Sequence, residues 1–267
     1  MNVDPVTWDD LEKINTLRPD GWSDIVPDFQ FYIKTAYCNP IKVELENEII
    51  AVGTSISFGR SAWLAHIIVD KRHRGIGVGS LVVNELITLL ESQGVETFSL
   101  LATEPGRPVY EKAGFRKVVD YVFMRRETPW QTRSISASIE PVQRHHVPAI
   151  MQLDRAVSGE DRRDLIEAHL QGAMVYARNA QVRGYYLPKL KEGLIVAEDE
   201  DAGLDLMEVK YATADKAVLP ESNRAGLNFL LANGFAPTHS KGTRMIRGKT
   251  LNPALSKIYS RIGGNLG

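Results

Sequence analysis

The segment 67–80 constrains this chain more than any other stretch of its sequence. It reads Ile-Ile-Val-Asp-Lys-Arg-His-Arg-Gly-Ile-Gly-Val-Gly-Ser, an apolar strand followed by a basic turn, alternating glycines and the start of a helix. Backbone N–H groups that glycines leave accessible at the positive end of a helix form a cradle for phosphate. Lys71, Arg72 and Arg74 add positive charge beside it. The segment predicts a strand–turn–helix unit that binds the pyrophosphate of a cofactor.

The spacing of the glycines excludes two common phosphate sites. A dinucleotide fingerprint requires G-x-G-x-x-G, whereas Gly75, Gly77 and Gly79 alternate and Ser80 follows them. The Gly-Lys-Ser/Thr ending of a nucleoside triphosphatase loop is also absent. What remains is an Arg-x-x-Gly-x-Gly motif that begins at Arg74. Taken alone, this motif leaves open an ordinary glycine-rich turn.

The elements around the turn follow one another in an informative order. Apolar residues at helical spacing run through 80–90, and the alternating residues at 98–102 predict a strand. A short tyrosine-containing helix at 109–115 ends in Gly-Phe. This order and both motifs resemble the GNAT superfamily of N-acetyltransferases over residues 1 to about 127. In that family Arg-x-x-Gly-x-Gly binds coenzyme A.

The resemblance implies acetyl-CoA as the cosubstrate. It also implies that the strand ending at Val69 carries a bulge and splays from its parallel neighbour at 95–102, so that the pantetheine arm lies in the gap. Thr103 stands in the place of the family's asparagine, which leaves that contact to pantetheine open. The residues expected to bind the cofactor are Ile67, Ile68, Val69, Arg74, Gly75, Ile76, Gly77, Val78, Gly79, Ser80 and Thr103.

Two side chains are candidates for the acid and the base of acetyl transfer. The leaving thiolate needs a proton, and the resemblance places Tyr110 where family members supply it. A phenol with a pKa near ~10 is protonated at neutral pH; packing of the helix start is the alternative role. His66, with a pKa suited to neutral catalysis, is the candidate base. A buried structural histidine, or a water chain that replaces the base, stays open.

The loop at 18–24 is the expected meeting point for the acceptor. Trp22 and Asp24 are the candidate substrate-binding residues. Trp22, beside Asp20, Asp24 and Asp28, could hold a cationic amine by its ring face and by charge. A solvated loop with one packing aromatic is the alternative. The histidines show no metal-ligand spacing with cysteine or paired carboxylates, so no metal is expected.

Three strands and two helices are expected before the glycine turn. Strands near 40–45, 48–58 and 62–69 would form a meander, because turn residues separate the apolar runs. Helices near 8–17 and 28–37 would precede this sheet.

Parts of the first half reappear in the second. Asp-Pro-Val at 4–6 returns as Glu-Pro-Val at 140–142, and Gly-Phe at 114–115 returns at 234–235. Matches in the same order predict duplication of a whole domain. The fold class is therefore α+β, with tandem GNAT-like domains that each contain a mixed, mostly antiparallel twisted sheet flanked by helices.

The second copy is expected to have lost its chemistry. We assign 1–127 to a catalytic domain and 134–267 to a degenerate GNAT-like domain. The latter has no Arg-x-x-Gly-x-Gly, carries four consecutive acidic residues at 198–201 that would repel a pyrophosphate, and has Leu230 in place of the tyrosine.

Composition limits the ligands and the cellular compartment that can be expected for this chain. Lys and Arg total 32 against 33 for Asp and Glu, so no overall field attracts nucleic acid or an anionic membrane. The sole cysteine, Cys38, excludes an intramolecular disulfide and fits a reducing compartment. With no N-terminal signal and no membrane-spanning run, a cytoplasmic location is expected.

The function expected from the sequence is acetyl-CoA-dependent N-acetyl transfer to a primary amine of a small-molecule acceptor, directly in a ternary complex. The alternative is a non-enzymatic acyl-CoA sensor or interaction module. The acceptor, the acyl length and the oligomeric state stay open.

Overall fold

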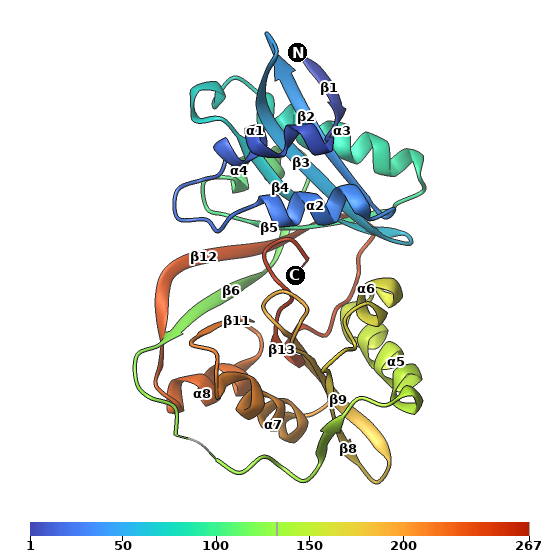
Figure 1. Ribbon diagram of the computed structural model, residues 1–267, viewed down its shortest axis with the longest axis vertical. Helices are drawn as coiled ribbons and strands as arrows, with labels where there is room; N and C mark the ends of the chain where they lie inside the picture. The colour runs from blue at the N-terminus through green and yellow to red at the C-terminus, as the bar shows by residue number, and fades with distance from the viewer. Residues whose placement is uncertain (132, 267) are drawn as a thin grey trace. The chain divides into compact units, whose positions relative to one another are not determined.

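The computed structural model of the protein describes residues 1–131 and 133–266 (Figure 1). The chain divides into two compact units. The first contains residues 1–117 together with 245–250 and 264–266, and the second contains 118–244 and 251–263. The units therefore differ from the sequence ranges 1–127 and 134–267: residues 118–127 lie in the second unit, and two short C-terminal segments lie in the first.

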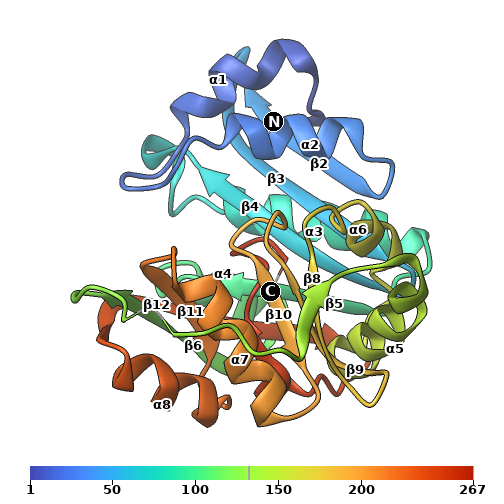
Figure 2. The same ribbon diagram turned by 60° about the horizontal axis from the view of Figure 1, so that its bottom comes forward.

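The first unit is a twisted sheet covered by helices. Its strands follow the order β1-β2-β3-β4-β5, and the end of β12 lies beside β5. Figures 1 and 2 show α1 and α2 on one face of the sheet and α3 on the other. The elements are β1 (Asn2–Pro5), η1 (Trp8–Asp10), α1 (Leu11–Thr16), α2 (Val26–Lys34), β2 (Cys38–Leu45), β3 (Glu48–Phe58), β4 (Ser61–Val69), η2 (Lys71–His73), α3 (Val78–Ser92), β5 (Thr97–Ala102) and α4 (Arg107–Lys112).

The meander and its turns were predictable from local sequence. The three expected strands are confirmed as β2, β3 and β4, all antiparallel in sequence order. Glu46 and Asn47 adopt φ values of 51° and 65°, which the two central residues of a type I′ hairpin turn require. Strands β2 and β3 can therefore pair immediately after the turn.

The helix α3 anchors the core under the glycine turn. Its residues Val82, Val83, Leu86 and Leu90 are fully buried against the sheet. Their spacing places them on one face of a helix. Gly94 follows with a φ of 82°, the left-handed conformation that ends many helices. This packing fixes where the N-terminus of α3 points.

The helix expected at 28–37 lies earlier in the chain, as α2 (Val26–Lys34). The Asp24 carboxylate accepts the backbone N–H of Val26, the first residue of the helix, at 2.9 Å. At the other end, Thr35 adopts extended backbone angles, and the helix stops. The earlier start was not predicted because a hydrogen bond from Val26 to Asp24 leaves no apolar periodicity in the sequence.

The second unit repeats the element order of the first. A short strand, a 3-10 turn and two helices lead into a three-stranded meander, then helix, strand, helix and strand. The predicted duplication is confirmed at this level. The elements are β6 (Arg116–Arg126), β7 (Ile139–Pro141), η3 (Arg144–His146), α5 (Val147–Ser158), α6 (Arg163–Glu167), β8 (Met174–Arg178), β9 (Gln181–Leu187), β10 (Leu194–Ala197), α7 (Glu200–Tyr211), β11 (Lys216–Pro220), α8 (Arg224–Ala232), β12 (Phe235–Gly248), η4 (Leu255–Lys257) and β13 (Ile258–Ser260).

Strands in the second unit form two groups. One sheet has the order β13-β10-β9-β8-β7, and β12, β6 and β11 are neighbours in the other. Because β6 pairs with β11 through residues 121–125 and 216–220, it belongs to this unit although it follows the first Gly-Phe motif. None of the helices in residues 1–131 and 133–266 is long and apolar enough to cross a membrane.

Candidate active site

The glycine turn presents an open helix N-terminus. Gly75 and Gly77 have φ values of 81° and 94°, a conformation in which other residues are strained, and Gly77 immediately precedes α3. No atom lies within 4 Å of a Cβ built on either glycine. The first N–H groups of a helix have no acceptor within it. The turn therefore offers backbone donors and space to an anion.

The basic residues of the turn differ in the ion pairs and hydrogen bonds that their side chains make. Lys71 pairs with Asp20 at 2.6 Å, and the Arg72 guanidinium donates to the Asp70 carboxylate at 2.9 Å. The hydrogen bonds from Arg72 lower the pKa of Asp70 to about 2. Arg74 donates from Nε to the carbonyl oxygen of Val69 at 3.0 Å.

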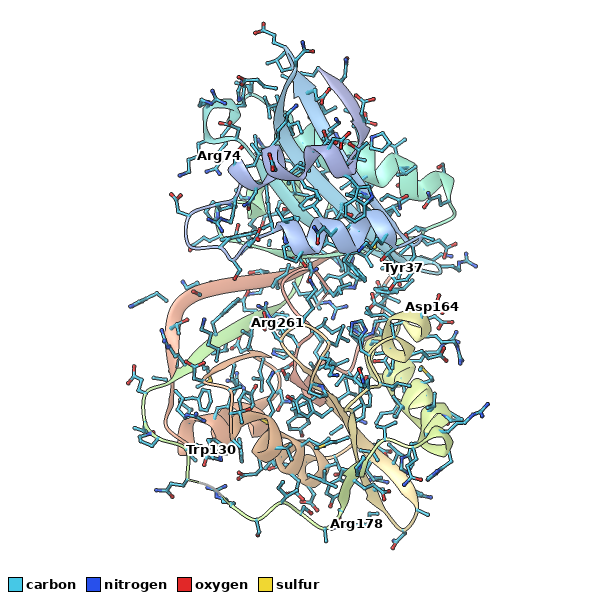
Figure 3. All side chains as sticks on the ribbon, in the orientation of Figure 1. Tyr37, Arg74, Trp130, Asp164, Arg178 and Arg261 are labelled. Carbon is cyan, nitrogen blue, oxygen red and sulfur yellow. The ribbon has the colours of Figure 1, made fainter. Side chains whose placement is uncertain are left out.

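Arg74 is labelled in Figure 3. Its Nε–H bond to the end of β4 holds the stem of the side chain beside the glycine turn. The Nη groups make no hydrogen bond or ion pair within the described part of the chain. A guanidinium held in this way can donate to a phosphate.

Strand β4 carries the expected bulge. Val52 of β3 faces Ile68 and Thr54 faces Ala65, so two residues of β4 oppose Gly53 alone. One of the two, His66, has a φ of 47°. A bulge with a residue in the left-handed region bends its strand and interrupts the ladder. The bulge implied by the family resemblance is confirmed.

Strands β4 and β5 also splay as expected. In the described structure they pair in parallel through the first three residues of each strand. Beyond Trp63 the last residues of β4 have no ladder partner on β5. The backbone of Ile67 to Val69 therefore borders a gap, and its binding of pantetheine remains a prediction.

The start of α4 brings together the residues expected near the thioester sulfur. The Thr103 carbonyl accepts the N–H groups of Gly106 and Arg107. A Cβ on Gly106 would lie 3.2 Å from Thr103 Oγ1 and 3.3 Å from Cε2 of Tyr110. Thr103 and Tyr110 are therefore close neighbours across this glycine.

Tyr110 packs edge-on against Phe115, with 6.1 Å between ring centroids. Its hydroxyl has no hydrogen-bond partner within residues 1–131 and 133–266. Burial raises the pKa of Tyr110 to about 12. The phenol therefore carries its proton at neutral pH and is not engaged elsewhere, as a proton donor must be.

His66 lies among aromatic and polar groups on the face of the sheet covered by α2. Its Nδ1 is 2.8 Å from the Tyr32 hydroxyl, and its Nε2 is 3.6 Å from Oδ2 of Asp28. The rings of Phe29 and Trp22 lie 5.8 and 6.0 Å away. Burial lowers the pKa of His66 to about 4. The expectation of a pKa suited to neutral catalysis is therefore wrong.

The two residues expected to bind the acceptor have different surroundings. Trp22 is 41% exposed and presents its ring at 73° to that of His66. Asp24 is exposed and accepts the backbone N–H of Val26 at the start of α2. This hydrogen bond engages the Asp24 carboxylate without a substrate, and its binding role remains a prediction.

Among the described residues of the second unit, the strand that corresponds to β4 is paired. Where β4 diverges from its neighbour, β10 is paired with β13, through Ile195 opposite Ser260 and Val196 opposite Ile258. The following helix, α7, is capped by its own Asp199, which accepts the N–H of Ala202 at 3.1 Å. These contacts fill the positions that remain open in the first unit.

Comparison with known proteins agrees with this geometry. The sequence profile of the acetyltransferase (GNAT) family matches residues 7–115, and that of the acetyltransferase (GNAT) domain matches residues 150–260. The chain belongs to the GNAT acetyltransferase family. It contains two GNAT domains.

Individual relatives are distant. The Bacillus subtilis protein named as an uncharacterized N-acetyltransferase, YitH, is 29% identical over 178 residues, which cover 61% of this chain and 61% of YitH. A Pyrococcus horikoshii protein has a TM-score of 0.83 at 18% identity over 100% of this chain and 95% of its own. A tandem GNAT protein from the clavulanic acid biosynthesis pathway has a TM-score of 0.61 at 11% identity, over 92% of this chain and 98% of its own. At these identities the structures support the fold alone.

Two polar residues beside His66 were not identified from the sequence. The contact of Tyr32 with His66 joins residues 34 positions apart. Asn265 donates to the Tyr32 hydroxyl at 2.6 Å across 233 positions. No sequence pattern marks either contact, because both depend on how the chain folds back.

Within the described residues, no cluster of three or more His, Cys, Asp or Glu side chains could hold a metal ion. Two cavities, of about 310 and 190 Å³, are lined by residues of the second unit. Neither is lined by the glycine turn. The residues of the first unit that fit acetyl-CoA are those of the open helix N-terminus and the splayed strand.

Proposed function

We propose that this chain transfers an acetyl group from acetyl-CoA to a primary amine of a small molecule. The observation that carries the proposal is the open N-terminus of α3 beside the bulged end of β4. Gly77 leaves space for a pyrophosphate, and the Arg74 guanidinium lies next to it. Acetyl-CoA supplies the activated thioester. The residues of this chain hold it, exclude water and move protons.

Transfer is proposed to be direct, within a ternary complex. A covalent acetyl-enzyme would need an activated nucleophile. Cys38 is buried, and burial raises the pKa of its thiol to about 12, so it carries no thiolate at neutral pH. The amine is therefore proposed to attack the thioester carbon directly, and Tyr110 is proposed to give its proton to the departing sulfur.

Free-thiol release tests this function. The full-length protein is mixed with acetyl-CoA and each member of a panel of primary amines, and thiol is measured over time. We expect release above the amine-free background with at least one amine, together with the acetylated product by mass spectrometry. Tight acetyl-CoA binding without release for any amine would favour the alternative, an acyl-CoA sensor.

The second GNAT domain is expected to bind no acetyl-CoA. β13 covers the edge of β10, and Asp199 occupies the start of α7. Calorimetry on the full chain should give one equivalent of acetyl-CoA per polypeptide. A stoichiometry of two that falls to one in a Gly77→Asp variant would contradict this prediction.

A further inference from the structure

A chain of polar contacts links the C-terminal segment to the acceptor side of the first unit. Asn265 Nδ2 lies 2.6 Å from the Tyr32 hydroxyl, which lies 2.8 Å from Nδ1 of His66. Nε2 of His66 then lies 3.6 Å from the Asp28 carboxylate. Asn265, Tyr32 and His66 are 6%, 0% and, for the histidine side chain, 10% exposed. These three side chains are largely shielded from solvent, and the Asp28 side chain is more exposed, at 21%.

The contacts determine where each proton lies. An amide nitrogen is a donor only, so the Tyr32 oxygen accepts from Asn265. If Nδ1 of His66 were the donor, the hydroxyl proton of Tyr32 would have no acceptor among the described residues, and a buried donor left unpaired is costly. The Tyr32 hydroxyl is therefore assigned as the donor to Nδ1. A neutral imidazole whose Nδ1 accepts carries its proton on Nε2. The His66 N–H therefore faces the Asp28 carboxylate.

We propose that Asn265 and Tyr32 are positioning residues that hold His66 in its Nε2–H form, and that Asp28 is the anion that binds the ammonium group of the acceptor. This deepens the proposed function and rests on it. His66 cannot accept a proton at Nε2 in this arrangement, so it orients Asp28 and is not the base. Asp28 has a side chain 21% exposed and stands at the solvent end of the contacts.

The chemistry assigns the acceptor to cationic amines. Asp28 lies in the first turn of α2, where a carboxylate is stabilised, and the half-exposed ring of Trp22 lies against His66. A carboxylate next to an aromatic face attracts an ammonium group. The bound ammonium loses one proton to water before its nitrogen forms a bond to the thioester carbon. A second proton passes from the nitrogen to water as the carbon–sulfur bond breaks. The sulfur gains its proton from Tyr110, and the Tyr110 phenolate then recovers one from water.

The tautomer can be observed directly in the unmodified protein. In a long-range ¹⁵N–¹H spectrum, the protonated nitrogen of a neutral imidazole resonates well apart from the unprotonated one. We expect Nε2 of His66 to be the protonated nitrogen at pH 7, with assignment by loss of the signals in His66→Gln. Protonation at Nδ1 would overturn the proposal.

Asn265→Asp tests the role of the C-terminal segment. A carboxylate at 265 accepts, so the Tyr32 proton turns toward it and the His66 proton moves to Nδ1. We expect the tautomer to switch, and kcat/KM for the amine to fall about tenfold or more, with the KM for acetyl-CoA unchanged. Asn252→Asp adds the same charge at an exposed site of the C-terminal region and should change neither. An unchanged His66 spectrum in a folded Asn265→Asp protein would contradict the proposal.

Tyr32→Phe gives a second test should the buried carboxylate at 265 prevent folding. Without the hydroxyl, Nδ1 of His66 has lost its donor, and we expect both tautomers to appear. A spectrum that still shows only the Nε2–H form would mean that Tyr32 does not position the ring.

Asp28→Asn tests the binding of the ammonium group. Loss of a charge-assisted contact should raise the KM for the amine about tenfold or more, with acetyl-CoA affinity unchanged. Asp4→Asn on β1 is the matched control. An unchanged amine KM would overturn the role of Asp28. A protein that shows the Nε2–H form and binds acetyl-CoA but acetylates no amine would instead overturn the proposed function.

Discussion

Replacing Gly77 with aspartate is expected to lower acetyl-CoA affinity by about 100-fold or more while the protein still folds. The new carboxylate would stand where the pyrophosphate is proposed to approach the start of α3. A Cβ at this position would meet no heavy atom within 4 Å beyond the neighbouring residues, so the protein should still fold. Two like charges about 5 Å apart repel by about 3 kcal/mol at an effective dielectric constant of 20. Such a penalty corresponds to about two orders of magnitude in the dissociation constant.

Calorimetry with acetyl-CoA measures the effect, and two variants separate its causes. Gly77→Asn has nearly the same shape without the charge, and asparagine tolerates the φ of 94° better than most residues. It should retain most of the affinity. Gly59→Asp places the same charge at another open turn glycine with a positive φ, between β3 and β4. It should bind acetyl-CoA as the parent does, and equal affinity in folded Gly77→Asp would rule out the glycine turn as the pyrophosphate site.

The first domain follows its sequence closely because its signals are local. The apolar runs at 48–58 and 61–69 and the turn residues between them determine the meander. The apolar spacing of α3 determines which face it buries. Glycine at 77 is needed for a φ of 94° at the helix start. Each of these features depends on residues that lie close together in the sequence.

Other features depend on contacts between distant segments and left no local signal. A φ of 47° at His66 could not be inferred from the residue type, since only a few per cent of non-glycine residues have a positive φ. The bulge was expected from the family resemblance alone. The low pKa of His66 follows from burial beneath α2, which the strand sequence does not encode. The contact of Asn265 with Tyr32 and the pairing of β13 with β10 likewise join segments far apart.

The division of β12 between the two units also depends on contacts between distant segments, which leave no local signal in the sequence. β12 is a single strand, Phe235–Gly248, yet its last residues belong to the first unit and the rest to the second. Apolar periodicity indicates a strand but not its neighbours. The predicted domain ranges, 1–127 and 134–267, therefore express the duplication of the sequence. They do not coincide with the compact units, which combine segments from distant parts of the chain.

Replacing Tyr110 with phenylalanine is expected to lower kcat by about 100-fold, with little change in acetyl-CoA affinity. Loss of a general acid costs about two to four orders of magnitude in rate. The ring itself is retained, so the edge-on contact with Phe115 and the packing of α4 persist. The hydroxyl is the only group removed. Single-turnover thiol release with saturating acetyl-CoA measures the chemical step apart from product release.

The pH dependence gives this prediction a second readout. A group that acts as an acid is active while protonated, and burial raises the pKa of Tyr110 to about 12. The parent enzyme should therefore show no loss of the Tyr110 proton between pH 7 and about pH 10, and the ratio of parent to Tyr110→Phe rates should stay constant over that interval. Tyr37→Phe, at a half-buried tyrosine of the same unit, is the matched control and should react at the parent rate. If Tyr110→Phe turns over as fast as Tyr37→Phe, the proton on sulfur comes from water and Tyr110 serves only to pack α4.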